Sequence, residues 1–404
     1  MKAPAITEGI GFINYSWPEL KLRVMVERMK DEGNAELSFY SANSSSDSLL
    51  HTARANLMST TTMNSLARRL EKNSQGVPWD EVLTYITGKT MTIIRRGEPA
   101  VEIWPSEDDD LIPSYLLEPI LYRNHPTVIF GEYSSLKSLT ALVISYVVQL
   151  PYHDNELGLI TQKEPTSCLY LDYEDDSSSF RRRWSALDRG FGKGATPIFY
   201  RRMTGTLSDS VEQLQKIIQD KNVGLVIVDS LGPAARGNLN DPEPAIKYHG
   251  ALRQLGITSL TLAHTSKDQL TKKKSIFGSV FFTNLARAVW ECKAEQETGE
   301  DEAVISLKQT KANLSRIHPP LCYRFAFENR TIRLKTADLN STGLSGELPI
   351  PFRIKNLLRN DQLTVKEISE ALDSTEDTTG RTLRRMRDRN QVVRLEEGRW
   401  GLSI

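Results

Sequence analysis

The sequence predicts an α/β protein whose central part is a parallel sheet covered by helices on both faces. Apolar strand candidates alternate here with helical patterns: the strands are at 127–130, 167–171, 225–228 and 259–262, and the helices at 139–149, 180–189, 211–220 and 245–255. This alternation is typical of βαβ units, and strands that are apolar throughout are expected to be buried on both faces. Ligands of such sheets bind beyond the carboxyl ends of the strands, which is where the polar residues of this segment gather.

Length and composition narrow the class of protein. A chain of 404 residues is long enough for about two or three domains, and 39% hydrophobic with 25% charged residues is the composition of a folded globular protein. Lys and Arg (51) balance Asp and Glu (51), so any attraction to nucleic acid must come from local patches. No apolar run approaches the ~20 residues that span a bilayer, and we therefore expect a cytoplasmic protein with no membrane partner.

The cysteines and histidines do not form a metal-binding pattern. Cys168, Cys292 and Cys322 lie far apart without a CxxC pair, and the 6 histidines contain no HExxH pair. We expect buried, reduced thiols, with neither a disulfide framework nor a protein-bound transition metal.

Two shifts in composition divide the chain. The acidic, turn-forming stretch WPSEDDDLIP lies near 105–110, and a stretch rich in Ser, Thr, Gly and Asn covers 335–348. The expected parts are a small N-terminal α+β domain at 1–105, a core at 106–335, a linker at 336–348 and a C-terminal domain at 349–404. In the first domain we expect a strand at 35–41, a helix over 48–71 and a helix beginning at Pro78. The sequence assigns no role to this domain.

A phosphate-binding loop is predicted at GEYSSLKS, residues 131–138, between a strand and a helix. Such a loop wraps backbone N–H groups around a β-phosphate, while a lysine reaches the β- and γ-phosphates and a hydroxyl binds Mg²⁺. Gly131, Lys137 and Ser138 fit the pattern G-x-x-x-x-G-K-[ST], but Leu136 replaces its second glycine. The alternative is an ordinary strand-to-helix turn. The candidate ligand-binding residues of the loop are Gly131, Glu132, Tyr133, Ser134, Ser135, Leu136, Lys137 and Ser138.

Three strand ends add candidate chemistry. Asp229 ends the apolar run VGLVIVD, and we expect it to close, from the neighbouring strand, the Mg²⁺ site begun by Ser138. Glu174, in YLDYEDD, is a candidate base for an attacking water, with a solvated acidic turn as the alternative. His264 ends TLAH, where it would report the state of a γ-phosphate or simply be hydrogen-bonded.

The order of these motifs resembles the RepA-like, RecA-fold P-loop ATPases, AAA family proteins whose relatives include hexameric replicative helicases. The resemblance covers about 112–327 and is carried by YLDYEDDSSSFRRRW, LVIVDSLGP, TLAHTSKD, GSVFFTNLARAVW and LKQTKANLSR. It implies a RecA-like core that binds ATP and Mg²⁺, with Glu174 as catalytic glutamate and His264 as sensor. It also implies that Arg287, and near it Lys311 and Asn313, approach the nucleotide across a subunit boundary, and hence a homo-oligomer, expected to be a hexamer.

Two regions are candidates for contact with DNA. RecA-type cores hold single-stranded DNA with loops that would here be 232–244 and 266–277, the second of which contains Lys267, Lys272, Lys273 and Lys274; the alternative is a solvated lysine turn. The tail, with helices at 350–359, 364–372 and 378–389 and a two-stranded wing at 392–402, resembles a winged helix-turn-helix. Its third helix would present Arg381, Arg384 and Arg385 to duplex DNA, and protein docking is the alternative role.

The sequence thus predicts an ATP-binding, ATP-hydrolysing RecA-fold protein that acts on DNA in replication or mobile-element maintenance, as a helicase-like ring motor or a loader. Because Leu136 stands where a phosphate loop has glycine, two alternatives stay open: a non-hydrolysing, nucleotide-responsive DNA-binding regulator, and a scaffold without nucleotide.

Overall fold

The chain divides into two compact units, Met1–Asp109 and Asp110–Ile404. The structure, a computed structural model, describes residues 1–9, 11–29, 33–43, 46–96, 100, 102, 104, 113–150, 155–192, 197–266, 274–339, 342, 344, 346 and 348–403. The first boundary lies close to the expected one at 105, while the C-terminal domain falls in the second unit together with the core.

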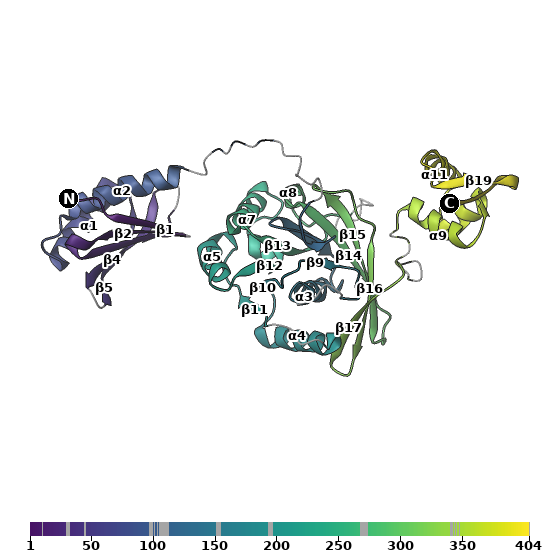
Figure 1. Ribbon diagram of the computed structural model, residues 1–404, viewed down its shortest axis with the longest axis horizontal. Helices are drawn as coiled ribbons and strands as arrows, with labels where there is room; N and C mark the ends of the chain where they lie inside the picture. The colour runs from purple at the N-terminus through teal and green to yellow at the C-terminus, as the bar shows by residue number, and fades with distance from the viewer. Residues whose placement is uncertain are drawn as a thin grey trace. The chain divides into compact units, whose positions relative to one another are not determined.

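The first unit is an antiparallel meander with helices on one face (Figure 1). Its elements are β1 (Ala5–Gly9), β2 (Phe12–Trp17), β3 (Leu22–Glu27), β4 (Asn34–Asn43), β5 (Ser46–Asn56), α1 (Thr60–Asn73) and α2 (Trp79–Arg96). Along β2, Ile13, Tyr15 and Trp17 are buried while the residues between them are half-buried. This period of two places one face of the sheet against α1 and α2, which contribute Leu66, Trp79 and similar residues to the same core.

The expected helix over 48–71 is wrong in its first half, because Ser46–Asn56 forms β5 and pairs with β4. Leu and Ala favour helix by themselves, but pairing along the whole of β4 outweighs that local preference. The helix α1 begins only after Ser59, whose hydroxyl caps it by accepting the N–H of Thr62 at 3.3 Å.

The second unit is built on one large sheet with the strand order β11-β10-β12-β13-β8-β14-β15-β16-β17. The strands from β11 to β14 pair in parallel, and the last three add an antiparallel extension. Of the parallel strands, β8, β10, β12 and β13 were expected, whereas β11 and β14 were not predicted. The parallel strands are β8 (Pro126–Gly131), β10 (Ser167–Asp172), β11 (Phe199–Arg202), β12 (Val223–Asp229), β13 (Thr258–His264) and β14 (Ala288–Glu295). The antiparallel strands are β15 (Glu302–Ala312), β16 (Leu321–Glu328) and β17 (Thr331–Thr336).

Helices cover both faces of the parallel strands (Figure 1). One core contains Ile129 of β8 with α3 and α4, and the other contains Val128 and Phe130 of β8 with α5, α6, α7 and α8. Successive residues of one strand therefore enter different cores, which explains why the strands are apolar throughout. The helices are α3 (Lys137–Val147), α4 (Ser177–Phe191), α5 (Val211–Asp220), α6 (Leu231–Ala235), α7 (Pro242–Leu255) and α8 (Val280–Leu285).

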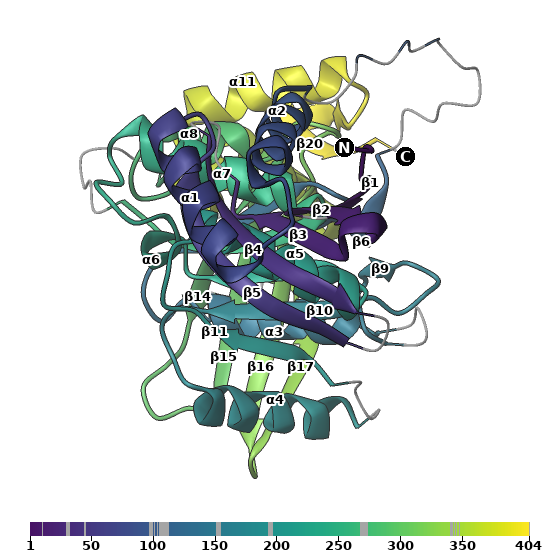
Figure 2. The same ribbon diagram turned by 90° about the vertical axis from the view of Figure 1, so that its left-hand side faces the viewer.

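Helix α4 packs against β17, the last strand of the antiparallel extension (Figure 2). Gly190 of α4 lies so close to this strand that a Cβ there would come within 1.7 Å of the carbonyl oxygen of Ile332. A further small sheet, β7-β6-β9, lies beside the core and consists of β6 (Tyr115–Glu118), β7 (Leu121–Tyr122) and β9 (Ile160–Thr161).

The tail contains every helix and strand expected for it. They are α9 (Ile350–Asn360), β18 (Leu363–Thr364), α10 (Val365–Leu372), α11 (Glu376–Asp388), β19 (Val392–Arg394) and β20 (Arg399–Leu402), with the sheet order β18-β20-β19. Thr364 and Glu367 form a capping box at the start of α10, and Ile368, Leu383 and Trp400 lie in a separate small core. None of the helices in the described parts of the chain is both long and apolar enough to cross a membrane.

Candidate active site

The loop between β8 and α3 keeps a backbone turn that suits glycine although leucine occupies it. Leu136 lies in the left-handed region, with φ 57° and ψ 23°, directly before the first residue of α3. This conformation costs a non-glycine residue roughly 1–2 kcal/mol. The half-buried side chain of Leu136 packs against the core that contains α3, which offsets part of that cost. Leucine in place of glycine at position 136 therefore adds a side chain but keeps the left-handed backbone of the turn.

Gly131 is required where the loop leaves β8. A Cβ at this residue would lie 2.3 Å from the carbonyl oxygen of Cys292 in β14 and 2.7 Å from Ser135 Oγ. The adjacent strand thus leaves no room for a side chain at the start of the loop.

Lys137 fills the hollow of its own loop. Its ammonium group donates to the carbonyl oxygens of Gly131 at 3.0 Å and Glu132 at 2.6 Å and to Ser135 Oγ at 3.1 Å. All three partners are neutral oxygens, and the side chain is buried. Burial lowers the pKa of Lys137. A desolvated ammonium group among neutral acceptors is well placed to bind a phosphate that enters the loop.

Asp229, the last residue of β12, lies near Ser138. The Asp229 carboxylate interacts with the Ser138 side chain and accepts the hydroxyl of Tyr170 at 2.6 Å. Asp229 is 7% exposed, and burial raises its pKa. Among the described residues no group of three His, Cys, Asp or Glu side chains is arranged to hold a metal. The hydroxyl and carboxylate fit Mg²⁺, which binds hard oxygen ligands and takes the remainder from phosphates and water.

The expectation that Asp229 ends the strand next to β8 is wrong, because β13 lies between β8 and β12. The order follows from the pairing of β13 with both strands, in parallel and in register. The inserted strand ends in His264, which pairs in register with Gly131. His264 therefore lies between the phosphate loop and the strand-end acids.

Glu174 and His264 also meet at this edge of the sheet. A carboxylate oxygen of Glu174 accepts the hydroxyl of Ser230 and lies 3.7 Å from His264 Nε2. The His264 ring also stacks at 4.7 Å between ring centroids on Tyr133, a loop residue that is 77% exposed. His264 Nδ1 is buried and has no hydrogen-bond partner among the described residues. The site thus joins the loop, a histidine and a carboxylate in one chain of contacts.

A cavity of about 420 Å³ opens on the β14 side of the loop. Its wall includes the loop itself, Glu291 and Lys293 of β14, whose charged groups lie 3.6 Å apart, and Gln296, which follows that strand. Lys137, Asp229 and Glu174 do not line it, because Lys137 turns inward to the loop carbonyls.

Arg287, Lys311 and Asn313 form a second cluster at the opposite end of the strands. The Arg287 N–H bonds to the carbonyl of Pro126, the first residue of β8, and its carbonyl accepts the N–H of Asn313. Lys311 donates to the carbonyls of Thr283, Asn284 and Ala286 at the end of α8. Since the phosphate loop follows the last residue of β8, the strand separates this cluster from the loop of the same chain.

Some of the residues expected to contact DNA are described by the structure, and several of these have partners within the protein. Lys267, Lys272 and Lys273 lie outside the described residues, whereas Lys274 forms an ion pair with Glu132 of the phosphate loop. This contact lowers the pKa of Glu132. On α11, Arg381 pairs with Asp377 one turn earlier, Arg384 donates to the Gly380 carbonyl at 3.2 Å, and Arg385 is exposed.

Sequence reasoning missed Asp172, Tyr170 and Ser230 as parts of the site. Asp172 ends β10 in register with Asp229, and Tyr170 lies two residues before it on the same face of the strand. The signal was available, because two neighbouring strands that each end in a carboxylate place both groups at one edge.

The raised pKa of Asp229 predicts a pH-dependent gain in stability for Asp229→Asn. Because the folded chain disfavours the ionised group, the carboxylate lowers the free energy of unfolding at neutral pH, and this penalty vanishes below about pH 4, where the group is protonated in both states. Without nucleotide, Asp229→Asn should raise the melting temperature of the core at pH 7 by about 2–4 °C per kcal/mol removed. The difference should disappear near pH 4. A rise of equal size at both pH values, or none at pH 7, would contradict this explanation.

Comparison with known proteins defines the class of the core. Residues 107–270 match the family model described as AAA domain. A solved structure of a KaiC-like protein from the hyperthermophilic archaeon Pyrococcus horikoshii OT3 is similar over 55% of this chain and 95% of that chain, with 16% identity and a TM-score of 0.39. No curated protein matches the chain by sequence. The match at 107–270, together with the sheet and the loop, gives the core the fold of RecA-like P-loop ATPases.

Proposed function

We propose that this chain binds ATP with Mg²⁺ at the phosphate loop, hydrolyses the ATP, and acts on DNA as one subunit of a ring. The observation that carries the proposal is the convergence of Lys137, the Ser138–Asp229 pair and Glu174 at one edge of the sheet. Burial lowers the pKa of Lys137, while the nearby carboxylates of Asp229 and Glu174 act in the opposite direction. A cation, two carboxylates and a hydroxyl are the groups that phosphoryl transfer to water requires.

Each group has a distinct task in this proposal. Lys137 exchanges its loop oxygens for β- and γ-phosphate oxygens. Its positive charge stabilises the negative charge that develops on the phosphate oxygens during transfer. Ser138 and Asp229 hold the Mg²⁺ ion, which neutralises phosphate charge when bound. The carboxylate of Glu174 is half-exposed, so water can reach it, and it accepts a hydrogen bond from Ser230. In this proposal it orients a water molecule and takes its proton. His264, in contact with both Glu174 and Tyr133, would sense the γ-phosphate.

A ring is supported by the place of Arg287. The strand β8 separates Arg287 from the phosphate loop of its own chain, and the side chain is exposed. An arginine in this place would serve the nucleotide of a neighbouring subunit through a head-to-tail contact, which closes into a ring when the rotation permits it. Lys311 caps the carbonyl end of α8 beside Arg287 and would hold this surface in shape. Our proposal is a homohexamer.

A mixing experiment tests the contact between subunits. Arg287→Ala and Lys137→Met should each abolish most ATP hydrolysis, the first by removing the arginine and the second by removing the phosphate ligand. A one-to-one mixture should recover about a quarter of the wild-type rate, because random assembly pairs an intact loop with an intact neighbouring arginine at that frequency in a head-to-tail ring. Phosphate release measures the rate, and light scattering checks assembly.

The outcome separates two roles of Arg287. If the mixture is no more active than the sum of its parts, Arg287 does not act across a subunit boundary. A mixture of Arg287→Ala with Glu243→Gln serves as the control, since the described ion pair of Glu243 is with Lys247 on the surface of α7 and this variant should act as wild type.

The proposed action on DNA is supported by the element order and the exposed arginines of the tail. In the tail, α10 and α11 follow each other across a short turn, and a small sheet follows, which is the element order of a winged helix-turn-helix. Arg384 and Arg385 are exposed on α11, where they can contact phosphates. A helicase-like motor or loader in replication or mobile-element maintenance fits a RecA-like core joined to such a module. Phosphate release should rise when single-stranded DNA is added.

Leu136 favours a second candidate, a nucleotide-responsive regulator that binds DNA without hydrolysis. Its side chain forms part of the loop wall where most phosphate loops have only a hydrogen atom. ATP binding without phosphate release, with or without DNA, would select this candidate. Failure to bind an ATP analogue would instead select a scaffold.

A further inference from the structure

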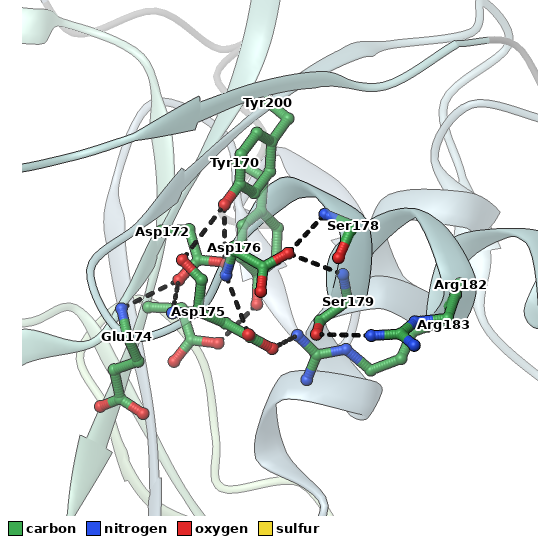
Figure 3. A network of polar contacts seen from close by, with 11 residues as sticks. Tyr170, Asp172, Glu174, Asp175, Asp176, Ser178, Ser179, Arg182, Arg183 and Tyr200 are labelled. Carbon is green, nitrogen blue, oxygen red and sulfur yellow. Dashed lines mark hydrogen bonds and ion pairs between the residues drawn. The ribbon is translucent and has the colours of Figure 1, made fainter.

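The turn that carries Glu174 is held by a buried carboxylate outside the proposed catalytic set. Asp172 is the last residue of β10 and is 2% exposed. One of its oxygens accepts the backbone N–H groups of Glu174 and Asp175, each at 2.9 Å (Figure 3). The other oxygen lies 3.3 Å from the hydroxyl of Tyr200 on β11, the strand beside it.

Every backbone N–H from Tyr173 to Asp176 has a partner. The Tyr173 N–H donates to the Asp229 carbonyl at 2.7 Å, the next two donate to Asp172, and the Asp176 N–H donates to Asp175 Oδ1 at 2.8 Å. Arg183 of α4 holds the Asp175 side chain at 2.8 Å. A turn with all its donors bonded has a fixed path, and the Cα of Glu174 is fixed with it.

The side chain of Glu174 is less constrained than its backbone. Figure 3 shows the carboxylate of Glu174 pointing away from Asp172 and the other labelled groups. It is 47% exposed, and its described contacts are with Ser230 and His264. The direction in which the carboxylate reaches therefore depends mainly on the backbone from which it projects.

We infer that Asp172 is a positioning residue, which aims Glu174 at the γ-phosphate by holding the N–H groups of residues 174 and 175, with Tyr200 holding Asp172 in turn. This inference rests on the proposed hydrolysis of ATP. Asp172 is not a second metal ligand in this account, because both its oxygens are directed at the turn and at Tyr200. Burial and the nearby carboxylate of Asp172 raise the pKa of Tyr200 to about 12, so its hydroxyl stays a donor at neutral pH.

The test uses two substitutions of Asp172 in the full chain, and repeats one of them in a Glu174→Gln background. Asp172→Ala should lower kcat for ATP hydrolysis by about 100-fold, the effect of displacing a reacting group by about 1 Å, while KM changes by less than about threefold. Asp172→Asn should keep most of the activity, because its amide oxygen still accepts both N–H groups. In a Glu174→Gln background, Asp172→Ala should cost less than about twofold more, since a positioning residue has no effect without the group it positions.

Asp176→Ala is the control for the substitutions of Asp172. Asp176→Ala removes the cap of α4 in the same turn without touching the bonds to Asp172, and should leave kcat within about threefold. Equal losses from Asp172→Ala in both backgrounds, or an Asp172→Asn variant as slow as Asp172→Ala, would overturn the inference alone. A wild-type chain that hydrolyses no ATP would overturn the proposed function and the inference with it.

A milder variant covers the case in which Asp172→Ala does not fold. Tyr200→Phe leaves both N–H bonds to Asp172 and removes the hydroxyl that bonds to Asp172 at 3.3 Å and to the Asp175 carbonyl oxygen at 3.5 Å, so kcat should fall by about 2- to 10-fold. The fall should again be absent in the Glu174→Gln background. An unchanged kcat, or an equal fall in both backgrounds, would overturn the inference.

Discussion

Glu174→Gln is expected to lower the rate of ATP hydrolysis by about 100- to 10,000-fold, the usual contribution of a general base. The amide keeps the size of the side chain and its acceptor for Ser230, but it cannot take a proton from water. ATP affinity should change by less than about threefold, because Glu174 lies near the γ-phosphate in this proposal but does not bind it. Single-turnover phosphate release and titration with a fluorescent ATP analogue measure the two quantities.

The matched control for this variant is Glu243→Gln, which makes the same chemical change on the exposed surface of α7. It should hydrolyse ATP at the wild-type rate. If Glu174→Gln retains more than about a tenth of the wild-type rate, a general-base role for Glu174 is wrong, and the acidic-turn alternative applies.

Lys137→Met is expected to weaken ATP binding by about 100-fold or more. The methionine keeps the apolar stem but removes an ammonium group that makes three hydrogen bonds within the loop and would make charged bonds to phosphate. Loss of two charged hydrogen bonds at about 1.5–3 kcal/mol each accounts for a change of this size. Calorimetric titration of the Mg²⁺-containing chain with a non-hydrolysable ATP analogue measures the affinity.

Lys247→Met provides the control, because Lys247 is an exposed lysine that pairs with Glu243 on α7. It should bind the analogue as the wild-type chain does. Equal affinities for Lys137→Met and wild type would show that the loop does not bind phosphate, whatever its resemblance to loops that do.

Four strands of the parallel part of the fold, β8, β10, β12 and β13, were predictable because they are buried on both faces. That burial makes 127–130, 167–171, 225–228 and 259–262 apolar throughout, and each is followed by a helix. Strand β5 was not predictable from local pattern, because its residues suit a helix and only pairing with β4 decides their conformation. The order of strands was also beyond reach, since the insertion of β13 between β8 and β12 depends on long-range pairing.

The candidate site was predictable in its residue types but not in its supporting contacts. Lys137, Asp229 and Glu174 follow strands in the sequence, and strand ends of one parallel sheet meet at one edge. The left-handed backbone of Leu136 could not be inferred, because residue type argues against it. The role of Asp172 was hidden for another reason, since its partners in the turn are backbone N–H groups that every residue carries.

The most direct test of the central claim is the structure of the chain with a non-hydrolysable ATP analogue and Mg²⁺. The ammonium group of Lys137 should leave the carbonyls of Gly131 and Glu132 and bind β- and γ-phosphate oxygens, with Ser138 and Asp229 on the metal side and Glu174 facing the γ-phosphate. Leu136 should keep its positive φ. A triphosphate bound away from this loop, or an analogue excluded from it by the Leu136 side chain, would contradict the account.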